Sequence, residues 1–415
     1  MSASLVQRYD PFGPEVMANP LPFYEALRDE APVHYLPEYD TFILTRFQDV
    51  WDVLGNVDNV FLSTEGSLPL PSQLRVHNNG AVPDPPTDPI GNANSFGSPI
   101  YEQFRQAQGR PLRPGAVARL EQMLREAARE RLDALIPQGE FDIVQDYGGH
   151  VSATAVCYLL GLDRDQAAEV LRIVNMSTQT HANDAGEPGL DLAVLLERAL
   201  AHMRPYVERQ RAQIDAGEKA DGGVVQGLMD MEFQGRMLSD PEVTRNMICI
   251  FVGGTETVPK VTGHGIWELL KNPEQLAAVK ENLAENVKIA REEFFRYCAP
   301  AQWFARTVRE ETEVNGVKMK PGQRVLSVIA SAQRDPREYE NPEVFQWDRK
   351  IERSVAFGRG QHFCVGYHLA RLEVAILTEE FLSRVDSFDV DEDAAIRHPS
   401  SFQWGYNSLT VRVKD

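Results

Sequence analysis

The segment that decides how the rest of the chain is interpreted is Phe357-Gly358-Arg359-Gly360-Gln361-His362-Phe363-Cys364-Val365-Gly366. Its glycines allow tight turns and let the backbone approach a flat ligand, where a Cβ atom would collide with it. Backbone N–H groups in such a loop can surround the Cys364 sulfur and temper the charge of its thiolate. The alternative is a buried structural cysteine. The pattern F-G-x-G-x-H-x-C-x-G would arise by chance in about one in a million chains of this composition, which favours a thiolate presented to a metal.

This pattern resembles the haem-binding signature of the cytochrome P450 family, and the following His368–Glu373 resemble the start of the long helix behind the haem. The resemblance implies that Cys364 is the fifth ligand of the iron of haem b, where a thiolate pushes electron density toward O–O cleavage. It also implies a mainly α fold with a minor β-sheet region and the haem between the long central helix and the cysteine loop. The other signature residues expected at the cofactor are Phe357, Gly358, His362 and Gly366.

The length and composition favour one large domain over residues 1–415, without a fused reductase, because no linker, repeat or low-complexity tract divides the chain. Apolar residues make up 43% of the sequence, which is enough for a sizeable core. No stretch approaches the roughly 18 consecutive apolar residues of a spanning helix, and no signal-peptide pattern opens the chain, so a cytoplasmic protein is expected. The four cysteines lie far apart, which indicates neither a disulfide framework nor a zinc site.

The net charge of −19 argues against nucleic acid and against anionic membrane surfaces as partners. Residues 103–120 differ from this background, since they contain no acidic residue and four arginines: Arg105, Arg110, Arg113 and Arg119. We call these four residues the basic island. It is either a docking surface for an acidic partner or an ordinary solvated helix surface.

Helical periodicity dominates the chain, and strand patterns are few. Helices are predicted over residues 22–30, from 47 onward, and over 117–135, 144–160, 163–176, 190–216, 224–231, 239–272, 273–279 and 285–297. Strands are predicted over 33–36, 41–45, 308–317 and 324–330, with a turn at Asn315-Gly316. Residues 63–99 are rich in Pro, Gly, Asn and Ser and are predicted to be a long irregular segment.

The longest predicted helix contains Phe251-Val252-Gly253-Gly254-Thr255-Glu256-Thr257. Each glycine weakens a helix by roughly 1 kcal/mol relative to alanine, so either a flat ligand approaches Gly253 closely or the pair marks a packing kink. An acid and an alcohol beside an opened helical ladder can relay protons. The segment resembles the oxygen-activation motif of the same family, which implies that Thr257 steadies bound oxygen and that Glu256 passes protons. Pro259 removes a further helical N–H and is predicted to deepen the kink.

Two later segments resemble the family's supporting motifs. Glu293-Phe294-Phe295-Arg296 places a carboxylate and a guanidinium on one helical face, as in the family's structural ion pair. The same E-x-x-R spacing also occurs at Glu126, Glu208 and Glu242, so the assignment depends on placement. Ten residues further on, Arg306 ends a segment that resembles the one whose arginine binds a haem propionate.

A further alignment with the family, on residues 116–121, concerns the opposite side of the haem. It places Arg105 at a propionate-binding arginine and Tyr101 where a histidine is common, which is a departure from the family pattern. The same alignment puts the basic island, including Arg110 and Arg113, on the proximal face. Family members receive electrons there from a separate ferredoxin or flavodoxin.

Family positions that contact substrate are mostly apolar in this chain, which suits a compact terpenoid or a substituted aromatic. Core packing is the alternative for each of them. The candidates are Phe96, Met176, Phe251, Val252, Gln302, Trp303, Phe304, Phe402 and Trp404, with Gln403 as a second polar group.

Taken together, these features predict a haem-thiolate monooxygenase that inserts one atom of O2 into a small hydrophobic substrate by hydroxylation or oxidative O-demethylation. Two alternatives remain open. One is a peroxygenase driven by peroxide, against which the retained acid and alcohol argue. The other is a non-enzymatic haem-thiolate sensor or carrier, which would not need that pair.

Overall fold

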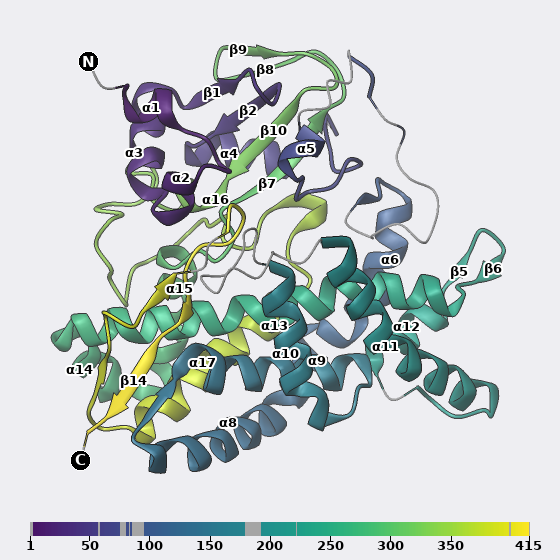
Figure 1. The fold of residues 1–415 in the computed structure, drawn as a ribbon, viewed down its shortest axis with the longest axis vertical. Helices are drawn as coiled ribbons and strands as arrows, with labels where there is room; N and C mark the ends of the chain where they lie inside the picture. Colours follow the sequence, from purple (N-terminus) through teal and green to yellow (C-terminus); the bar gives the residue numbers. More distant parts are fainter. Residues whose placement is uncertain are drawn as a thin grey trace.

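The described chain forms a helical part and a smaller part built around a sheet, which Figure 1 shows above the helices. The computed structural model describes residues 3–56, 59–74, 80–82, 84, 95–178, 192–220, 222–397 and 400–414. Strands near the N-terminus pair with strands that follow residue 300, so the sheet joins segments that are distant in sequence. No described helix is both long enough and apolar enough to cross a bilayer.

The main sheet has five strands and is buried on both faces. Its order is β1 (Val33–Leu36), β2 (Thr41–Leu44), β10 (Arg324–Val328), β7 (Trp303–Val308) and β3 (Phe61–Leu62). Strand β10 runs parallel to β2 and antiparallel to β7. The paired residues Ile43 and Leu326 enter one core cluster, whereas their neighbours Phe42 and Val325 enter another. Since side chains alternate between the faces of a strand, each face of the sheet has its own core.

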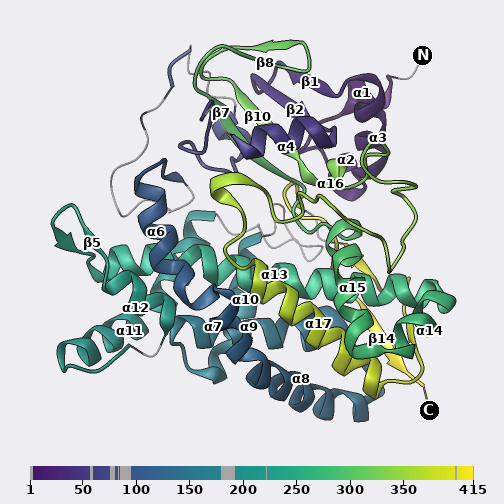
Figure 2. The same cartoon turned by 180° about the vertical axis from the view of Figure 1, so that it is seen from behind.

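The helical part surrounds one long helix, α13 (Asp240–Lys271), which crosses the molecule in Figures 1 and 2. The predicted bounds of α13 are confirmed, since the helix begins after Ser239 and ends at Asn272-Pro273. At its start, Ser239 and Glu242 form a capping box. The other long helices are α6 (Ile100–Gly109), α8 (Glu121–Leu135), α9 (His150–Leu160), α10 (Ala167–Thr178), α11 (Leu192–Asp215), α12 (Gly223–Met229), α14 (Pro273–Glu281), α15 (Leu283–Tyr297) and α17 (Tyr367–Arg384).

The predicted balance of helix and sheet is confirmed, but the strand predicted over residues 308–317 is wrong. Residues 312–319 form a hairpin of β8 (Thr312–Val314) and β9 (Val317–Met319), whose predicted turn has positive φ at Asn315 (49°) and Gly316 (80°). The strand that is buried in this part of the chain is β7. Periodicity did not predict it, because Arg306 interrupts its apolar sequence.

Other boundaries also differ from prediction. The strand predicted over 324–330 stops at Val328, where α16 (Ile329–Ala332) begins. The helix predicted over 144–160 starts as a π-helix, η5 (Ile143–Gly149). Parts of the irregular segment predicted over 63–99 lie outside the described residues, as do residues 179–191, which follow α10.

The predicted ion pair of Glu293 and Arg296 is fully buried and bidentate, with two N–O distances of 2.7 Å. Arg349 also approaches Glu293, at 3.2 Å, and Arg296 donates to the carbonyls of Gln333 and Pro342. This network therefore ties α15 to two segments that follow the main sheet.

The other E-x-x-R motifs use different partners: Arg129 bonds to Glu380, Arg211 to Asp240, and Glu242 to Arg236. An exposed example of the same spacing is formed by Glu169 and Arg172 on α10, at 2.6 Å.

Replacing Arg296 by Leu should lower the free energy of unfolding by about 3–5 kcal/mol, because it leaves the Glu293 carboxylate buried without its main partner. Arg172→Leu is the matched control, since Glu169 keeps its contact with water, and the expected loss is about 0.3–0.5 kcal/mol. Thermal and denaturant unfolding of both variants would measure the difference. Equal losses would mean that the buried pair has no special structural role.

Candidate functional site

The cysteine loop is held in shape by glycines and by backbone hydrogen bonds. Gly358 and Gly360 have φ of 68° and 69°, values that L side chains rarely adopt. A Cβ at Gly360 would lie 2.7 Å from the carbonyl oxygens of Leu54 and Gly55, so the loop fits closely over the end of α4 (Phe47–Gly55). The Cys364 N–H donates to the Phe357 carbonyl at 2.9 Å, which closes the loop.

The Cys364 thiol lies at a cavity of about 340 Å³, between α6 and the start of α17. Burial raises the pKa of this thiol, whereas the Gly366 N–H and the Arg105 guanidinium lower it. A Cβ at Gly366 would lie 3.8 Å from the Cys364 sulfur, an ordinary contact distance, so Gly366 lies directly beside the sulfur. The sulfur is thus presented with a backbone donor and a nearby cation, as a thiolate ligand requires.

Four predicted cofactor residues from separate elements come together at this site: Tyr101 and Arg105 of α6, Arg306 of β7, and His362 of the loop. The rings of Tyr101 and His362 are 4.2 Å apart, and Arg105 donates to the Tyr101 hydroxyl at 3.2 Å. The His362 Nε2 atom is 3.0 Å from the Ser63 hydroxyl, and its Nδ1 atom is buried without a hydrogen-bond partner in the part of the chain that the structure describes.

The arginine of β7 has no counter-charge among the described residues. Arg306 is only 4% exposed, and its one hydrogen bond among the described residues goes to the Ala305 carbonyl. Burial, with Arg324 nearby, lowers the pKa of Arg306 to about 10. Burial, and then Arg306 and Arg105, lower the pKa of His362 to about 3. Because buried charges are normally paired, the donor set fits a ligand with carboxylates, such as the two propionates of haem.

The two glycines of α13 have different surroundings. A Cβ at Gly254 would lie 2.7 Å from Val156 of α9, so this glycine permits the two helices to pack closely. Apart from the backbone of α13 itself, a Cβ at Gly253 would meet no atom of the described residues within 4 Å, which leaves room for a flat ligand. The Thr257 hydroxyl donates to the Gly253 carbonyl at 3.1 Å and so lies beside this open space.

The kink predicted for α13 does not interrupt the helix, which continues from Asp240 to Lys271 through Pro259. A Cβ at Gly148 of η5 would lie 3.2 Å from the Pro259 Cβ, so a glycine on the neighbouring element makes room for the proline ring. Glu256 is 2% exposed and forms an ion pair with Lys260, one helical turn later. The sequence analysis did not identify Lys260, although the i,i+4 spacing of a carboxylate and an ammonium was a signal for it.

The substrate candidates divide by exposure. Phe304 and Phe402 are partly exposed, and their rings lie 5.5 Å apart. Met176 and Val252 are also partly exposed. The candidates that are buried in the protein are Phe96, Phe251, Gln302, Trp303 and Trp404.

Gln302, like Gln403, is a predicted orienting group whose side-chain amide is already used within the protein. It accepts from Tyr24 at 2.6 Å and donates to the carbonyls of Ser400 and Gln403. This favours a structural role for Gln302.

Comparison with known proteins agrees with this geometry. The family model described as cytochrome P450 matches residues 192–405, which is more than half of the chain. The chain belongs to the cytochrome P450 family. Proteins of this family are monooxygenases that bind haem through a cysteine thiolate.

The relatives of this P450 are distant but cover nearly its whole length. A beta-dihydromenaquinone-9 omega-hydroxylase of Mycobacterium tuberculosis (strain ATCC 25618 / H37Rv) is 29% identical over 92% of this chain and 74% of its own. Cytochrome P450 109 of Bacillus spizizenii is 27% identical over 95% of this chain and 92% of its own. Among solved structures, CYP109E1 from Bacillus megaterium in complex with testosterone has a TM-score of 0.81 at 24% identity, covering 97% of this chain and all of that one. A mutant of P450 EryK in complex with erythromycin B has a TM-score of 0.82 at 25% identity, covering 96% and 97%.

The two adjacent glycines of α13 provide a matched test of the site. Gly254→Ala should lower the free energy of unfolding by about 1–3 kcal/mol, because the added methyl meets Val156. Gly253→Ala should not destabilise the protein, since the methyl enters open space and alanine favours a helix by about 1 kcal/mol. It should instead change the absorption spectrum of the bound haem. Thermal unfolding and absorption spectra of both variants would show this, and similar destabilisation by both would contradict it.

Proposed function

We propose that this P450 uses Cys364 as the thiolate ligand of haem and inserts one oxygen atom from O2 into a small hydrophobic substrate, by hydroxylation or oxidative O-demethylation. The observation that carries the proposal is the convergence of the Cys364 loop with the buried Arg306 and the partly exposed Arg105 and His362. None of the three has a counter-charge within the described chain. A single domain over residues 1–415, with electrons from a separate protein, completes the proposal.

In this proposal each residue has a defined task. Cys364 holds the iron, and the Gly366 N–H donates to its sulfur. Arg105, Arg306 and His362 bind the propionates, and the Tyr101 hydroxyl supplies a donor where a histidine is common in the family. When bound, the haem supplies the binding and reductive activation of dioxygen.

Residues of α13 deliver the protons in this proposal. The Thr257 hydroxyl can donate and accept a hydrogen bond beside the open space at Gly253, and Glu256 is the nearest acid in the helix. A positioned acid and alcohol of this kind contribute roughly 10²–10⁴-fold to proton-dependent steps.

The proposed substrate is a terpenoid or a substituted aromatic. The partly exposed rings of Phe304 and Phe402 offer an apolar wall, and flat or compact rings pack well on such surfaces. The solved relatives were determined with testosterone and with erythromycin B, so ligands in this fold differ widely in size. The choice of a small substrate therefore depends on the aromatic lining of this chain.

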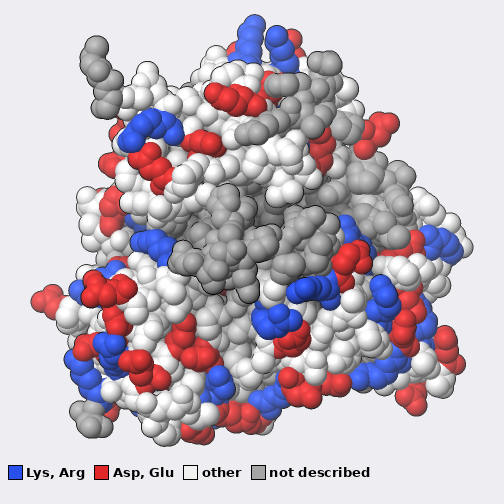
Figure 3. All heavy atoms as spheres, in the orientation of Figure 1, with Lys and Arg blue, Asp and Glu red and all other residues white. Residues whose placement is uncertain are grey.

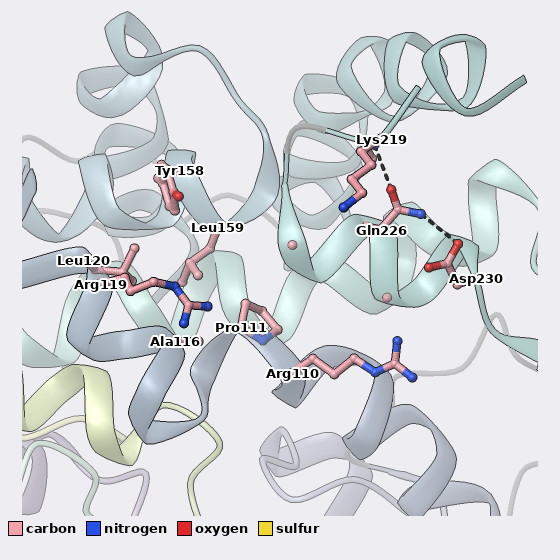
Figure 4. Close-up of a pocket in the computed structure, with 13 residues that line it drawn as sticks. Arg110, Pro111, Ala116, Arg119, Leu120, Tyr158, Leu159, Lys219, Gln226 and Asp230 are labelled. Carbon is pink, nitrogen blue, oxygen red and sulfur yellow. Dashed lines mark hydrogen bonds between the residues drawn. The ribbon is translucent and has the colours of Figure 1, made fainter. Parts of the chain in front are cut away.

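The proposed electron donor is an acidic ferredoxin or flavodoxin that docks on the basic island. Arg105 and Arg113 line the cavity beside Cys364, while Arg110 and Arg119 line a neighbouring cavity of about 340 Å³ together with Lys219. Figure 4 shows Arg110, Arg119 and Lys219 around the second cavity, where the Gln226 amide donates to the Asp230 carboxylate.

The island lies on α6 and the short elements that follow it, which Figure 2 shows in front of α13. The opposite face, in Figure 3, has acidic and basic side chains interspersed. An acidic donor would therefore be steered to the face that carries Cys364.

Replacing Cys364 by Ala should abolish thiolate ligation. The reduced protein with carbon monoxide should show a strongly red-shifted Soret band before the change and lose it afterwards, because only a thiolate produces that shift. Cys298→Ala is the control, since Cys298 is a buried core residue and its variant should keep the band. A red-shifted band that survives in the Cys364 variant would refute the assignment.

Removing Arg110 and Arg113 together should slow reduction by an added ferredoxin roughly ten-fold at low ionic strength, with a smaller loss as salt screens the charges. Stopped-flow reduction at several salt concentrations would measure this. A variant without Arg164 and Arg309, which are exposed and paired with Glu130 and Glu310, changes the net charge equally and serves as the control. A loss that does not depend on salt would exclude charge-steered docking at the island.

A further inference from the structure

A closed triangle of side-chain contacts joins Glu256 and Lys260 of α13 to Gln403, which lies 143 residues after Lys260. Lys260 forms an ion pair with Glu256 Oε1 and donates to Gln403 Oε1 at 2.5 Å. Gln403 Nε2 in turn donates to Glu256 Oε2 at 2.6 Å. The three residues are 2%, 2% and 4% exposed, so the carboxylate is held from both sides in the protein interior.

The backbone around Gln403 is itself firmly held. Its N–H donates to the Ser400 hydroxyl at 3.0 Å, its carbonyl accepts from Gln302 at 3.1 Å, and it forms a β-bridge with Ala301. Two residues later, a Cβ at Gly405 would lie 3.6 Å from the Lys260 Cβ, which brings the backbone of residues 400–405 against the lysine. The triangle is thus a fixed contact between α13 and this C-terminal segment.

The two residues of the proposed proton-handling pair, Glu256 and Thr257, point in opposite directions along α13. Thr257 donates back along the helix to the Gly253 carbonyl, whereas Glu256 contacts Lys260 one turn further on. Burial lowers the pKa of Lys260, and within the described chain Glu256 is the one charged group whose field opposes this. A buried carboxylate that loses its cation is strongly destabilised, so the two residues depend on each other for their charge.

We propose that Lys260 and Gln403 are positioning residues for Glu256: they hold its carboxylate as the anion of a buried ion pair, one helical turn beyond Thr257. The inference rests on the proposed role of Glu256 in proton delivery. Gln403 lies between Phe402 and Trp404, two of the substrate candidates. Its hydrogen bond to Glu256 therefore links the position of this carboxylate to a segment that is proposed to contact substrate. Proton delivery in this P450 therefore depends on residues outside the Gly253–Thr257 motif.

The first experiment measures the thermal midpoint of the holoprotein between about pH 5 and 8. Lys260→Met should lower the midpoint, and the loss should grow as the pH rises. The Glu256 carboxylate, buried without its cation, binds a proton more tightly in the folded than in the unfolded state. Protonation therefore stabilises the folded variant at low pH, and this stabilisation is lost as the pH rises. The double variant Glu256→Gln with Lys260→Met should recover most of the midpoint and lose the added pH dependence. A loss that is equal at all pH values and is not recovered would show that Lys260 only fills space.

The second experiment measures hydrogen exchange of residues 400–405 in the same proteins. Lys260→Met should speed exchange in this segment, because Gln403 loses a partner there. Lys271→Met is the matched control on α13, since Lys271 pairs with Glu268 and should leave residues 400–405 unchanged. If the exchange rates of residues 400–405 are unchanged in the Lys260 variant, the proposed contact between Lys260 and Gln403 does not hold this segment.

The third measurement is the pH profile of NADH-supported dioxygen consumption with an added ferredoxin and its reductase. Lys260→Met should lower the rate roughly ten-fold and shift the profile, as expected for a displaced acid. Thr257→Ala separates the two proposals. If it has no effect on the rate or on peroxide release, the proposed proton role of α13 fails. If it has an effect and Lys260→Met changes neither rate nor profile, the positioning role alone fails.

Discussion

The constraint on which this structure depends is the burial of the Arg306 guanidinium, which has no counter-charge among the described residues and has a neutral His362 beside it. Arg306 lies in the middle of a buried strand, and His362 is held beside it with a pKa of about 3. Charges in such surroundings are costly unless an anion joins them. The sheet, α6 and the cysteine loop meet at this point, where the proposed propionate ligands would supply the missing negative charge.

Glycine is the second requirement, and its positions have separate physical reasons. Gly360 adopts a positive φ and lets the cysteine loop contact the end of α4, while Gly254 lets α13 approach α9. Gly253 instead faces open space. The sequence indicated that these glycines matter, but the pattern alone could not separate a packing contact from a ligand contact.

Local signals predicted the parts of the fold that local interactions determine. The start of α13 at Ser239 and the turn at Asn315-Gly316 are examples, since both depend on residues within four positions of each other. Strand β7 was missed because its stability comes from pairing with β10 and β3, whereas its own sequence is interrupted by Arg306. The E-x-x-R motifs show the same limit: identical spacing gives a buried pair at Glu293, and at Glu126 an arginine that turns to Glu380.

The acid of α13 illustrates how a local motif and a distant contact combine. The segment Gly253–Thr257 was sufficient to predict an acid next to an alcohol, and the spacing of Glu256 and Lys260 contains the signal for an ion pair. Gln403 could not be predicted, because only the folded chain brings residues 400–405 onto α13. A carboxylate shared between a lysine of its own helix and an amide of a distant segment has its position determined by both. The position of this acid is then a property of the tertiary structure, even though the motif that contains it is continuous in sequence.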